Sequence, residues 1–296
     1  MADVLLPTTV AELVAARAAD PTALVLAGGT DLMVAVNAGW TAPRSVIALR
    51  RVADLRGVRV DGDEVVVGAG TTYRQLLEPD VAALVPALAQ AARTVGSPQI
   101  RAAGTLGGNV GTASPAGDTL PVLVAAGATI ELAGPDGPRA LPASDFFVGV
   151  KRTALAEGEV ITAVRLPAVA GPQAYKKVGV RNAMVIAVAS VALVVDAERR
   201  RVGVGLGSVG PVPLVAPDAG AFAVEAIDWE AGTLAEPDAA VRFGELVAAA
   251  SAPIDDHRST AAYRRHAVGV MAARALRDAF PPPGASDAVG SAEDAA

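Results

Sequence analysis

The sequence predicts an α+β protein, and two observations carry this prediction. The turn Asp61-Gly62-Asp63 lies between two runs rich in valine, which is a strong signal for a β-hairpin. Three more strand signals between residues 174 and 208 are followed by a long helical segment close to the C-terminus. Paired strands and helices therefore occur together, while the first 55 residues alone fit either an α+β or an α/β arrangement.

The individual elements follow from hydrophobic periodicity and from glycine and proline positions. Before residue 56 we expect a helix at 10–17, a strand at 23–26, a helix at 31–36 and a strand at 45–49. The next part should hold hairpin strands at 58–60 and 64–67, helices at 73–77, 81–94 and 120–126, and a strand at 128–132. After a Pro/Gly break at 167–172 we expect strands at 174–178, 187–195 and 202–208, and a helix at 261–280.

These signals divide the chain into an N-terminal part at 1–55, a middle part at 56–170 and a C-terminal part at 171–280. Residues 281–296 begin with prolines, continue with small and acidic residues, and are expected to be disordered. The helix near the C-terminus carries arginines beside apolar side chains. It therefore either offers a docking face to a partner or covers its own sheet as an ordinary amphipathic helix.

Composition and charge exclude several classes of function. A net charge of -6 argues against nucleic-acid binding, and the apolar run 183–195 is shorter than the roughly 20 residues of a membrane-spanning helix. The N-terminus lacks the pattern of a signal peptide, so a cytoplasmic location is expected. With Cys 0 the chain can form neither a disulfide nor a cysteine-ligated cluster. Only His257 and His266 could supply imidazole, so no catalytic triad or metal site is expected.

The first segment with candidate chemistry is Leu26-Ala27-Gly28-Gly29-Thr30-Asp31-Leu32, at a junction between a strand and a helix. Two glycines allow positive φ and let an anion approach the backbone N–H groups, which suits a pyrophosphate. The segment is neither a G-x-G-x-x-G motif nor a Walker A loop. The alternative is a plain helix start with Thr30 or Asp31 as N-cap.

The second segment is Gly104-Thr105-Leu106-Gly107-Gly108-Asn109, continued by Ser114-Pro115-Ala116-Gly117-Asp118. So many glycines lose much conformational entropy on folding, and close approach of the backbone to a bulky ligand would explain them. Polar groups of Thr105, Asn109 and Ser114 suit phosphate oxygens, and Asp118 suits sugar hydroxyls or the N-cap of the next helix. Two such segments in one chain imply a dinucleotide lying between two lobes.

In this order, the motifs resemble those of the FAD-binding medium subunit of molybdenum hydroxylases, the xanthine dehydrogenase and carbon monoxide dehydrogenase family. The resemblance covers nearly the whole chain. Beyond the two glycine-rich segments, it rests on Gln99-Ile100-Arg101, Asp145-Phe146-Phe147, Lys151-Arg152-Thr153, Tyr175-Lys176-Lys177-Val178 with Arg181, Val209-Gly210-Pro211-Val212-Pro213, Pro253-Ile254-Asp255-Asp256 and Tyr263-Arg264-Arg265-His266.

The resemblance implies a two-subdomain FAD-binding unit of the vanillyl-alcohol-oxidase (PCMH) type and a C-terminal α+β subdomain with an antiparallel sheet. Residues 27–32 and 105–109 would surround the pyrophosphate, and Asp118 would hold the sugar or ribityl part. Ile161, on a strand at 160–166, and Lys176 would lie near the flavin ring, unless Lys176 is a solvated strand lysine. The expected FAD-binding residues are Leu26, Ala27, Gly28, Gly29, Thr30, Asp31, Leu32, Thr105, Gly107, Gly108, Asn109, Ser114, Asp118, Ile161 and Lys176.

The resemblance also implies an oxidoreductase subunit without catalytic residues or metal ligands of its own. A large subunit would hold the molybdenum cofactor, and a small [2Fe-2S] subunit would pass electrons to the FAD, which would reduce an external acceptor. A dimer of heterotrimers is the usual assembly. Because the chain has no cysteine and His257 and His266 lie outside the matched loops, the FAD should be non-covalent. Two alternatives remain, a stand-alone FAD oxidoreductase and a scaffold whose glycine loops are structural.

Overall fold

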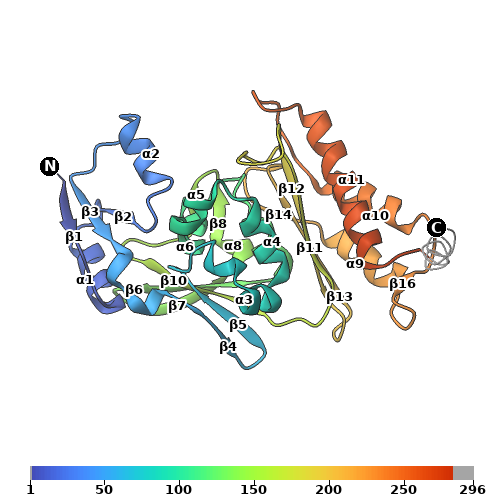
Figure 1. Ribbon diagram of the computed structural model, residues 1–296, viewed down its shortest axis with the longest axis horizontal. Coiled ribbons are helices and arrows are strands. Elements are labelled where there is room, and N and C mark those ends of the chain that lie inside the picture. The colour runs from blue at the N-terminus through green and yellow to red at the C-terminus, as the bar shows by residue number, and fades with distance from the viewer. Residues whose placement is uncertain (1, 283–296) are drawn as a thin grey trace, which may run out of the picture.

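The computed structural model describes residues 2–282 and contains three larger sheets, which follow one another along the molecule (Figure 1). The first sheet has three parallel strands in the order β1-β3-β2. They are β1 (Asp3–Leu5), β2 (Leu24–Leu26) and β3 (Ser45–Ala48), with helices α1 (Val10–Ala19) and α2 (Leu32–Asn37) between them. The expected elements of the N-terminal part are therefore present, and β1 is an additional strand.

The second sheet is antiparallel, with the order β4-β5-β10-β6-β7. Its strands are β4 (Val58–Asp61), β5 (Glu64–Gly68), β6 (Thr129–Gly134), β7 (Gly137–Pro142) and β10 (Val160–Pro167). Asp61 pairs with Glu64, as the hairpin signal predicts. A short ribbon of β8 (Phe147–Gly149) and β9 (Arg152–Thr153) follows α8 (Ala143–Phe146).

The helices of the middle part differ from expectation at three places. The helix expected at 81–94 is split into α3 (Pro79–Leu84) and α4 (Pro86–Thr94), because proline disfavours helical conformation in the residue before it and begins α4. The helix expected at 73–77 is a single 3₁₀ turn, Gln75–Leu77. The glycine-rich span forms two short helices, α5 (Pro98–Ala103) and α6 (Leu106–Thr112). They were not expected, because glycine has a low helix propensity.

Helix α7 (Leu120–Ala126) lies at the centre of the protein, and all of its residues are buried. A side chain on Gly203 would place its Cβ 1.9 Å from the carbonyl oxygen of Ala125, and one on Gly205 would lie 1.9 Å from that of Pro121. The backbones of α7 and of strand β13 (Arg201–Gly207) are therefore in direct contact. Only glycine at these two positions permits so close an approach.

The third sheet is antiparallel, with the order β11-β12-β13-β14, where β11 is Gln173–Val178, β12 is Ala189–Asp196 and β14 is Leu214–Val215. Every residue of β12 is buried, because its two faces belong to different cores. Ala192 and Val194 pack with α4 and α7, whereas Val191 and Leu193 lie beneath the C-terminal helices. This explains the nearly continuous apolar run in the sequence.

Three helices cover the outer face of the third sheet (Figure 1), α9 (Pro217–Ala226), α10 (Ala239–Ala250) and α11 (Ala261–Ala279). Between α9 and α10 lies a ribbon of β15 (Ile227–Asp228) and β16 (Thr233–Leu234). Val268 and Leu276 of α11 are fully buried in the core under this layer, so the helix covers its own sheet. Of the tail expected to be disordered at 281–296, residues 283–296 lie outside the described residues. Within residues 2–282, no helix has the length and apolar character needed to cross a membrane.

Candidate functional site

A cleft of about 700 Å³ lies where the first sheet meets helices α5 and α6. Both glycine-rich segments line it, although about seventy residues separate them in the sequence. The predicted residues found in its wall are Leu26, Ala27, Gly28, Gly29, Thr30, Asp31, Leu32, Thr105, Gly107, Gly108, Asn109, Ser114, Asp118 and Ile161. The structure thus brings together the whole predicted set except Lys176.

The first glycine-rich segment is a tight turn between β2 and α2. Gly29 has a φ of +72°, and a Cβ on Gly28 would lie 1.8 Å from the carbonyl oxygen of Ala103, so neither position accepts a side chain. In the described part of the chain, the amides of Gly29, Thr30 and Asp31 have no hydrogen-bond acceptor. Unpaired N–H groups at the wall of a cleft are suited to bind an anion. Helix α2 has only six residues, so its dipole is weak. The attraction for an anion therefore comes mainly from these amides.

The second segment uses its amides differently. Leu106 N–H donates to the carbonyl of Thr71 at 2.9 Å, and Gly107 N–H donates to that of Ala69 at 2.8 Å. Thr105 caps α6 by accepting the amide of Gly108 at 3.0 Å. These three amides are therefore occupied within the protein, and the segment must contact a ligand through its side chains and its bare backbone surface.

The glycines of the second segment also divide into two kinds. A Cβ on Gly107 would lie 2.7 Å from the carbonyl oxygen of Ala69, so this glycine is required by packing of the chain on itself. A Cβ on Gly108 would meet only the hydroxyl of Thr105 at 3.0 Å and the methyl of Ala27 at 3.9 Å. Gly108 faces open space in the cleft, and its missing side chain leaves room for a ligand.

Polar side chains beyond Gly108 are held in place by neighbours. The carbonyl oxygen of the Asn109 side chain accepts the hydroxyl of Thr119 at 2.5 Å, so its amide nitrogen stays available as a donor. Ser114 accepts the amide of Ala116 at 3.3 Å and keeps its own hydroxyl hydrogen. Both side chains can therefore donate to a polar ligand.

Asp118 is the buried acid of the cleft. Its side chain accepts the hydroxyl of Tyr175 at 2.8 Å and pairs with the ammonium of Lys177 at 2.7 Å. Burial raises the pKa of Asp118, while the charge of Lys177 acts in the opposite direction. It does not cap α7, whose N-cap residue is Thr119. A carboxylate offers about four lone-pair sites, so capacity remains for a ligand hydroxyl.

Lys176 is not brought to the cleft. Its ammonium pairs with Asp278 of α11 at 2.7 Å, and its neighbour Lys177 points to the opposite face of β11, toward Asp118. Successive side chains of a strand point to opposite faces, so only one of the two lysines can reach this side. No lysine or arginine occurs among the cleft-lining residues in the described part of the chain.

The prediction missed several residues of the cleft wall. They are mostly apolar, and apart from Ile100 they lie outside the motifs that the sequence offers: Val25, Ala35, Leu49, Ala69, Tyr73, Val95, Gly96, Ile100, Leu155, Val160, Met184, Val185 and Ile186. Glu159 also lines the cleft, but its carboxylate is paired with Arg139 and accepts the amide of Ala156. These hydrogen bonds lower the pKa of Glu159.

Comparison with known proteins places this geometry among flavoprotein subunits. Residues 1–169 match the family model described as the FAD binding domain in molybdopterin dehydrogenase, and residues 173–279 match the CO dehydrogenase flavoprotein C-terminal domain. The carbon monoxide dehydrogenase medium chain of Afipia carboxidovorans is 34% identical over 260 residues, covering 86% of this chain and 88% of that one. The glyceraldehyde dehydrogenase medium chain of Sulfolobus acidocaldarius is 33% identical over 258 residues, covering 86% and 89%.

Solved structures share the arrangement of the entire described fold. Reconstituted CO dehydrogenase from Oligotropha carboxidovorans matches with a TM-score of 0.86 and 33% identity, covering 94% of this chain and 97% of that one. Quinoline 2-oxidoreductase from Pseudomonas putida 86 matches with a TM-score of 0.85 and 25% identity, covering 94% and 96%.

Proposed function

This chain belongs to the family of FAD-binding domains of molybdopterin dehydrogenases, and from that membership we propose that it binds FAD non-covalently in the cleft, as the electron-transfer subunit of a molybdenum-containing dehydrogenase. The observation that carries the proposal is the convergence of both glycine-rich segments on one cleft. Its volume of about 700 Å³ is within the range of cofactor pockets.

The residues present fit such a cofactor. The unpaired amides of Gly29, Thr30 and Asp31 would bind the pyrophosphate, and the bare backbone at Gly108 would let it lie close to α6. Asn109 would donate from its side-chain amide nitrogen. A diphosphate needs several donors but no specific base, so backbone amides are sufficient.

The sugar and ribityl hydroxyls would be held at the far side of α6. Asp118 would accept hydroxyl hydrogens there, because Tyr175 and Lys177 fix its carboxylate and leave lone pairs unused. Ser114 would add a hydroxyl that can donate or accept. Since Lys177 compensates the buried charge of Asp118, the carboxylate is held ready for this role before the cofactor arrives.

The wall contributed by Ile161, at the start of β10, and by residues 184–186 is apolar and would exclude water from the ring. Bound FAD would supply the chemistry, which is acceptance of electrons from a [2Fe-2S] subunit and their delivery to an external acceptor. The large partner would hold the molybdenum cofactor, and a dimer of heterotrimers is the proposed assembly. The medium-chain relatives and the matching dehydrogenase structures support these partners.

A stand-alone FAD oxidoreductase is less well supported by the cleft. Such an enzyme needs an acid or base that is free to exchange a proton with substrate. Of the carboxylates that line the cleft, Asp118 and Glu159 are each paired with a cation of the same chain, and Asp31 is exposed at the turn after β2. Neither paired carboxylate is free to exchange a proton with a substrate.

The test is the visible absorption spectrum of the purified protein, followed by acid release and identification of the flavin. We expect release of FAD, and we expect Gly108→Val to abolish its binding because the new side chain would fill the open space above α6. Ala262→Val, on an exposed position of α11, serves as the control and should bind FAD normally. If well-folded protein does not bind added FAD, the cleft has another ligand.

The partner proposal is tested separately by purifying a tagged chain from its native host. We expect it to bring down a larger chain containing molybdenum and a smaller chain containing iron and sulfur. Recovery of the flavoprotein alone, at physiological ionic strength and with its FAD in place, would support the stand-alone enzyme instead.

A further inference from the structure

The loop at 179–188, here called the cleft loop, joins β11 to β12 and supplies part of the cleft wall through Met184, Val185 and Ile186. It folds back on itself. A Cβ on Gly179 would lie 2.5 Å from Val185, and Met184 has a left-handed φ of +49°. Met184 and Ile186 are 56% and 52% exposed, so little packing holds the tip of the loop in place. Within the loop, Arg181 donates to the carbonyl of Met184 at 3.2 Å, and the position of the loop as a whole is set at its ends.

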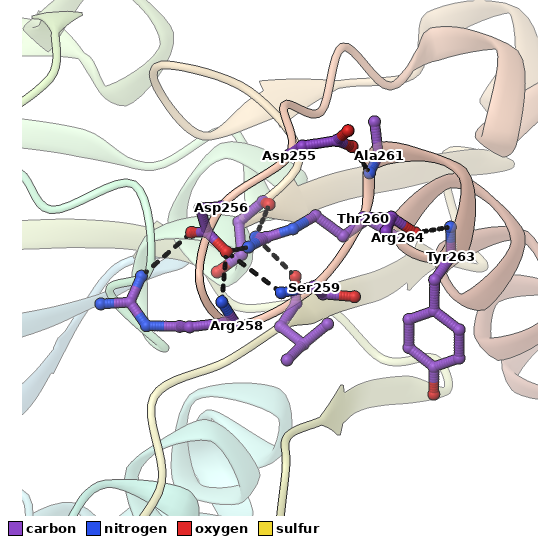
Figure 2. Close-up of polar contacts among 10 residues, drawn as sticks. Asp255, Asp256, Arg258, Ser259, Thr260, Ala261, Tyr263 and Arg264 are labelled. Carbon is purple, nitrogen blue, oxygen red and sulfur yellow. Dashed lines mark hydrogen bonds and ion pairs between the residues drawn. The ribbon is translucent and has the colours of Figure 1, made fainter.

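The C-terminal end of the cleft loop is held on both sides of Val188: its amide donates to the carbonyl of Val178 at 2.8 Å, and its carbonyl accepts from Arg264 of α11 (Figure 2). One terminal nitrogen of its guanidinium donates to the carbonyl of Val188 at 3.0 Å and to that of Ser208 at 2.9 Å. The other terminal nitrogen pairs with Asp256. These two carbonyls lie just outside the β12–β13 ladder, whose pairing begins with Ser190 and Gly207. One side chain thus joins the cleft loop, the end of β13 and the segment before α11.

The place of Arg264 is not explained by the stability of its helix. It lies in the first turn of α11, the end at which the helix dipole disfavours a positive charge. It is also only 4% exposed, and arginine is almost never buried to this degree unless it is paired, as it is here with Asp256. A sequence that breaks local preferences in this way usually does so for a tertiary or functional reason.

The carboxylate of Asp256, which pairs with the guanidinium of Arg264, is held in position by other hydrogen bonds. Its carboxylate accepts the amides of Arg258 at 2.8 Å and Ser259 at 3.2 Å, which form a tight turn around it (Figure 2). Thr260 caps α11 by accepting the amide of Tyr263 at 3.2 Å, so the helix start is fixed relative to the turn. The guanidinium is consequently held from the C-terminal part and reaches outward to the cleft loop.

We propose that Arg264 is a positioning residue of the cleft, which fixes Val188 and thereby the wall formed by Met184, Val185 and Ile186. Through it, helix α11 acts on the wall of the cleft that the C-terminal part of the chain supplies, opposite the walls from the N-terminal and middle parts. The identity of the ligand as FAD rests on the proposed function above, but the effect of Arg264 on the loop does not.

The test compares Arg264→Lys with Arg265→Ala, an exposed neighbour on the same helix. Lysine keeps the charge for Asp256 but lacks the planar fork that bridges two carbonyls. In protein freed of cofactor, we expect the amides of residues 179–188 to exchange hydrogen about tenfold faster in Arg264→Lys, the change expected for one lost charge-assisted hydrogen bond. The strand amides of β12 and β13 and the whole Arg265→Ala variant should exchange as in the parent.

The second readout is FAD affinity, measured by fluorescence titration. We expect Arg264→Lys to bind FAD about tenfold more weakly, because the loop must be ordered on binding. Arg264→Ala should show a larger effect in both readouts if it remains folded. Unchanged loop exchange in folded Arg264→Lys would overturn the proposal, as would faster loop exchange with unaltered affinity. A parent protein that binds no FAD would instead overturn the proposed function, with the exchange experiment still deciding the role of Arg264.

Discussion

Lys177 forms an ion pair that joins the C-terminal part of the chain to the middle part. Replacing it by methionine should destabilise the protein more than replacing a charged residue in any other ion pair that joins two parts. The ion pair of Lys177 with Asp118 is buried, with 7% and 8% of the two side chains exposed. Methionine keeps most of the length of the stem, so the main loss is the positive charge rather than volume. Breaking a buried pair by removing one partner costs about 3–5 kcal/mol, because the other charge is left uncompensated.

The pH dependence distinguishes this cause from a loss of packing. Burial already raises the pKa of Asp118 above its ordinary value, and removing Lys177 takes away the largest opposing influence. A carboxyl whose folded pKa is raised is destabilising when ionised, and the folded state gains stability as pH falls through that pKa. The free energy lost in Lys177→Met should therefore be smaller at a pH close to the ordinary carboxyl pKa of 3.8 than at neutral pH.

The assay is urea denaturation of the parent and of Lys177→Met at both pH values. Lys176→Met is the matched control, because its pair with Asp278 is largely exposed and worth less than about 1 kcal/mol. A loss below about 1 kcal/mol for Lys177→Met, or a loss that is the same at both pH values, would refute the reasoning.

Three further predictions concern other parts of the molecule. Thr260→Ala removes the N-cap of α11 and should lower the unfolding free energy by about 1 kcal/mol in denaturant titrations, whereas Thr260→Ser should restore most of it. Burial opposes the charge of Asp256, but hydrogen bonds from Arg258, Arg264 and Ser259 outweigh it and lower its pKa from 3.8 to about 2. A lowered folded pKa gives stability that is present above pH 3.8 and lost as pH falls toward 2, so the deficit of Asp256→Asn should disappear over that window in acid unfolding curves. Gly205→Ala should yield little folded protein in expression trials, since its Cβ would lie 1.9 Å from the carbonyl oxygen of Pro121, and Ala262→Gly, on an exposed helix position, should cost only about 1 kcal/mol.

Elements with a local pattern could be predicted from the sequence. The hairpin at 58–67 and helix α11 follow from turn chemistry and periodicity, and the structure places them where they were expected. Elements that depend on tertiary contacts could not. Helix α6 contains three glycines and forms because Thr105 caps it and because Leu106 and Gly107 bond to the segment after β5.

The same distinction applies to the cleft. The two glycine-rich segments could be predicted, because glycine marks positions where the backbone has a positive φ or comes very close to another group. Which of Lys176 and Lys177 points toward Asp118 depends on the register of β11 against β12, and the sequence pattern leaves that open. The contribution of residues 184–186 depends on how a loop folds over a distant helix, and no residue type in it signals a ligand.

The direct contact between α7 and β13 has a consequence for how the protein can be divided. Family models split the chain between residues 169 and 173, as though two independent modules met there. A chain ending at that boundary would leave one flank of α7 facing water, although every residue of this helix is apolar and buried. We therefore expect the isolated N-terminal module to aggregate when it is expressed alone. We expect the two domains to unfold in a single cooperative transition, because neither can bury α7 without the other.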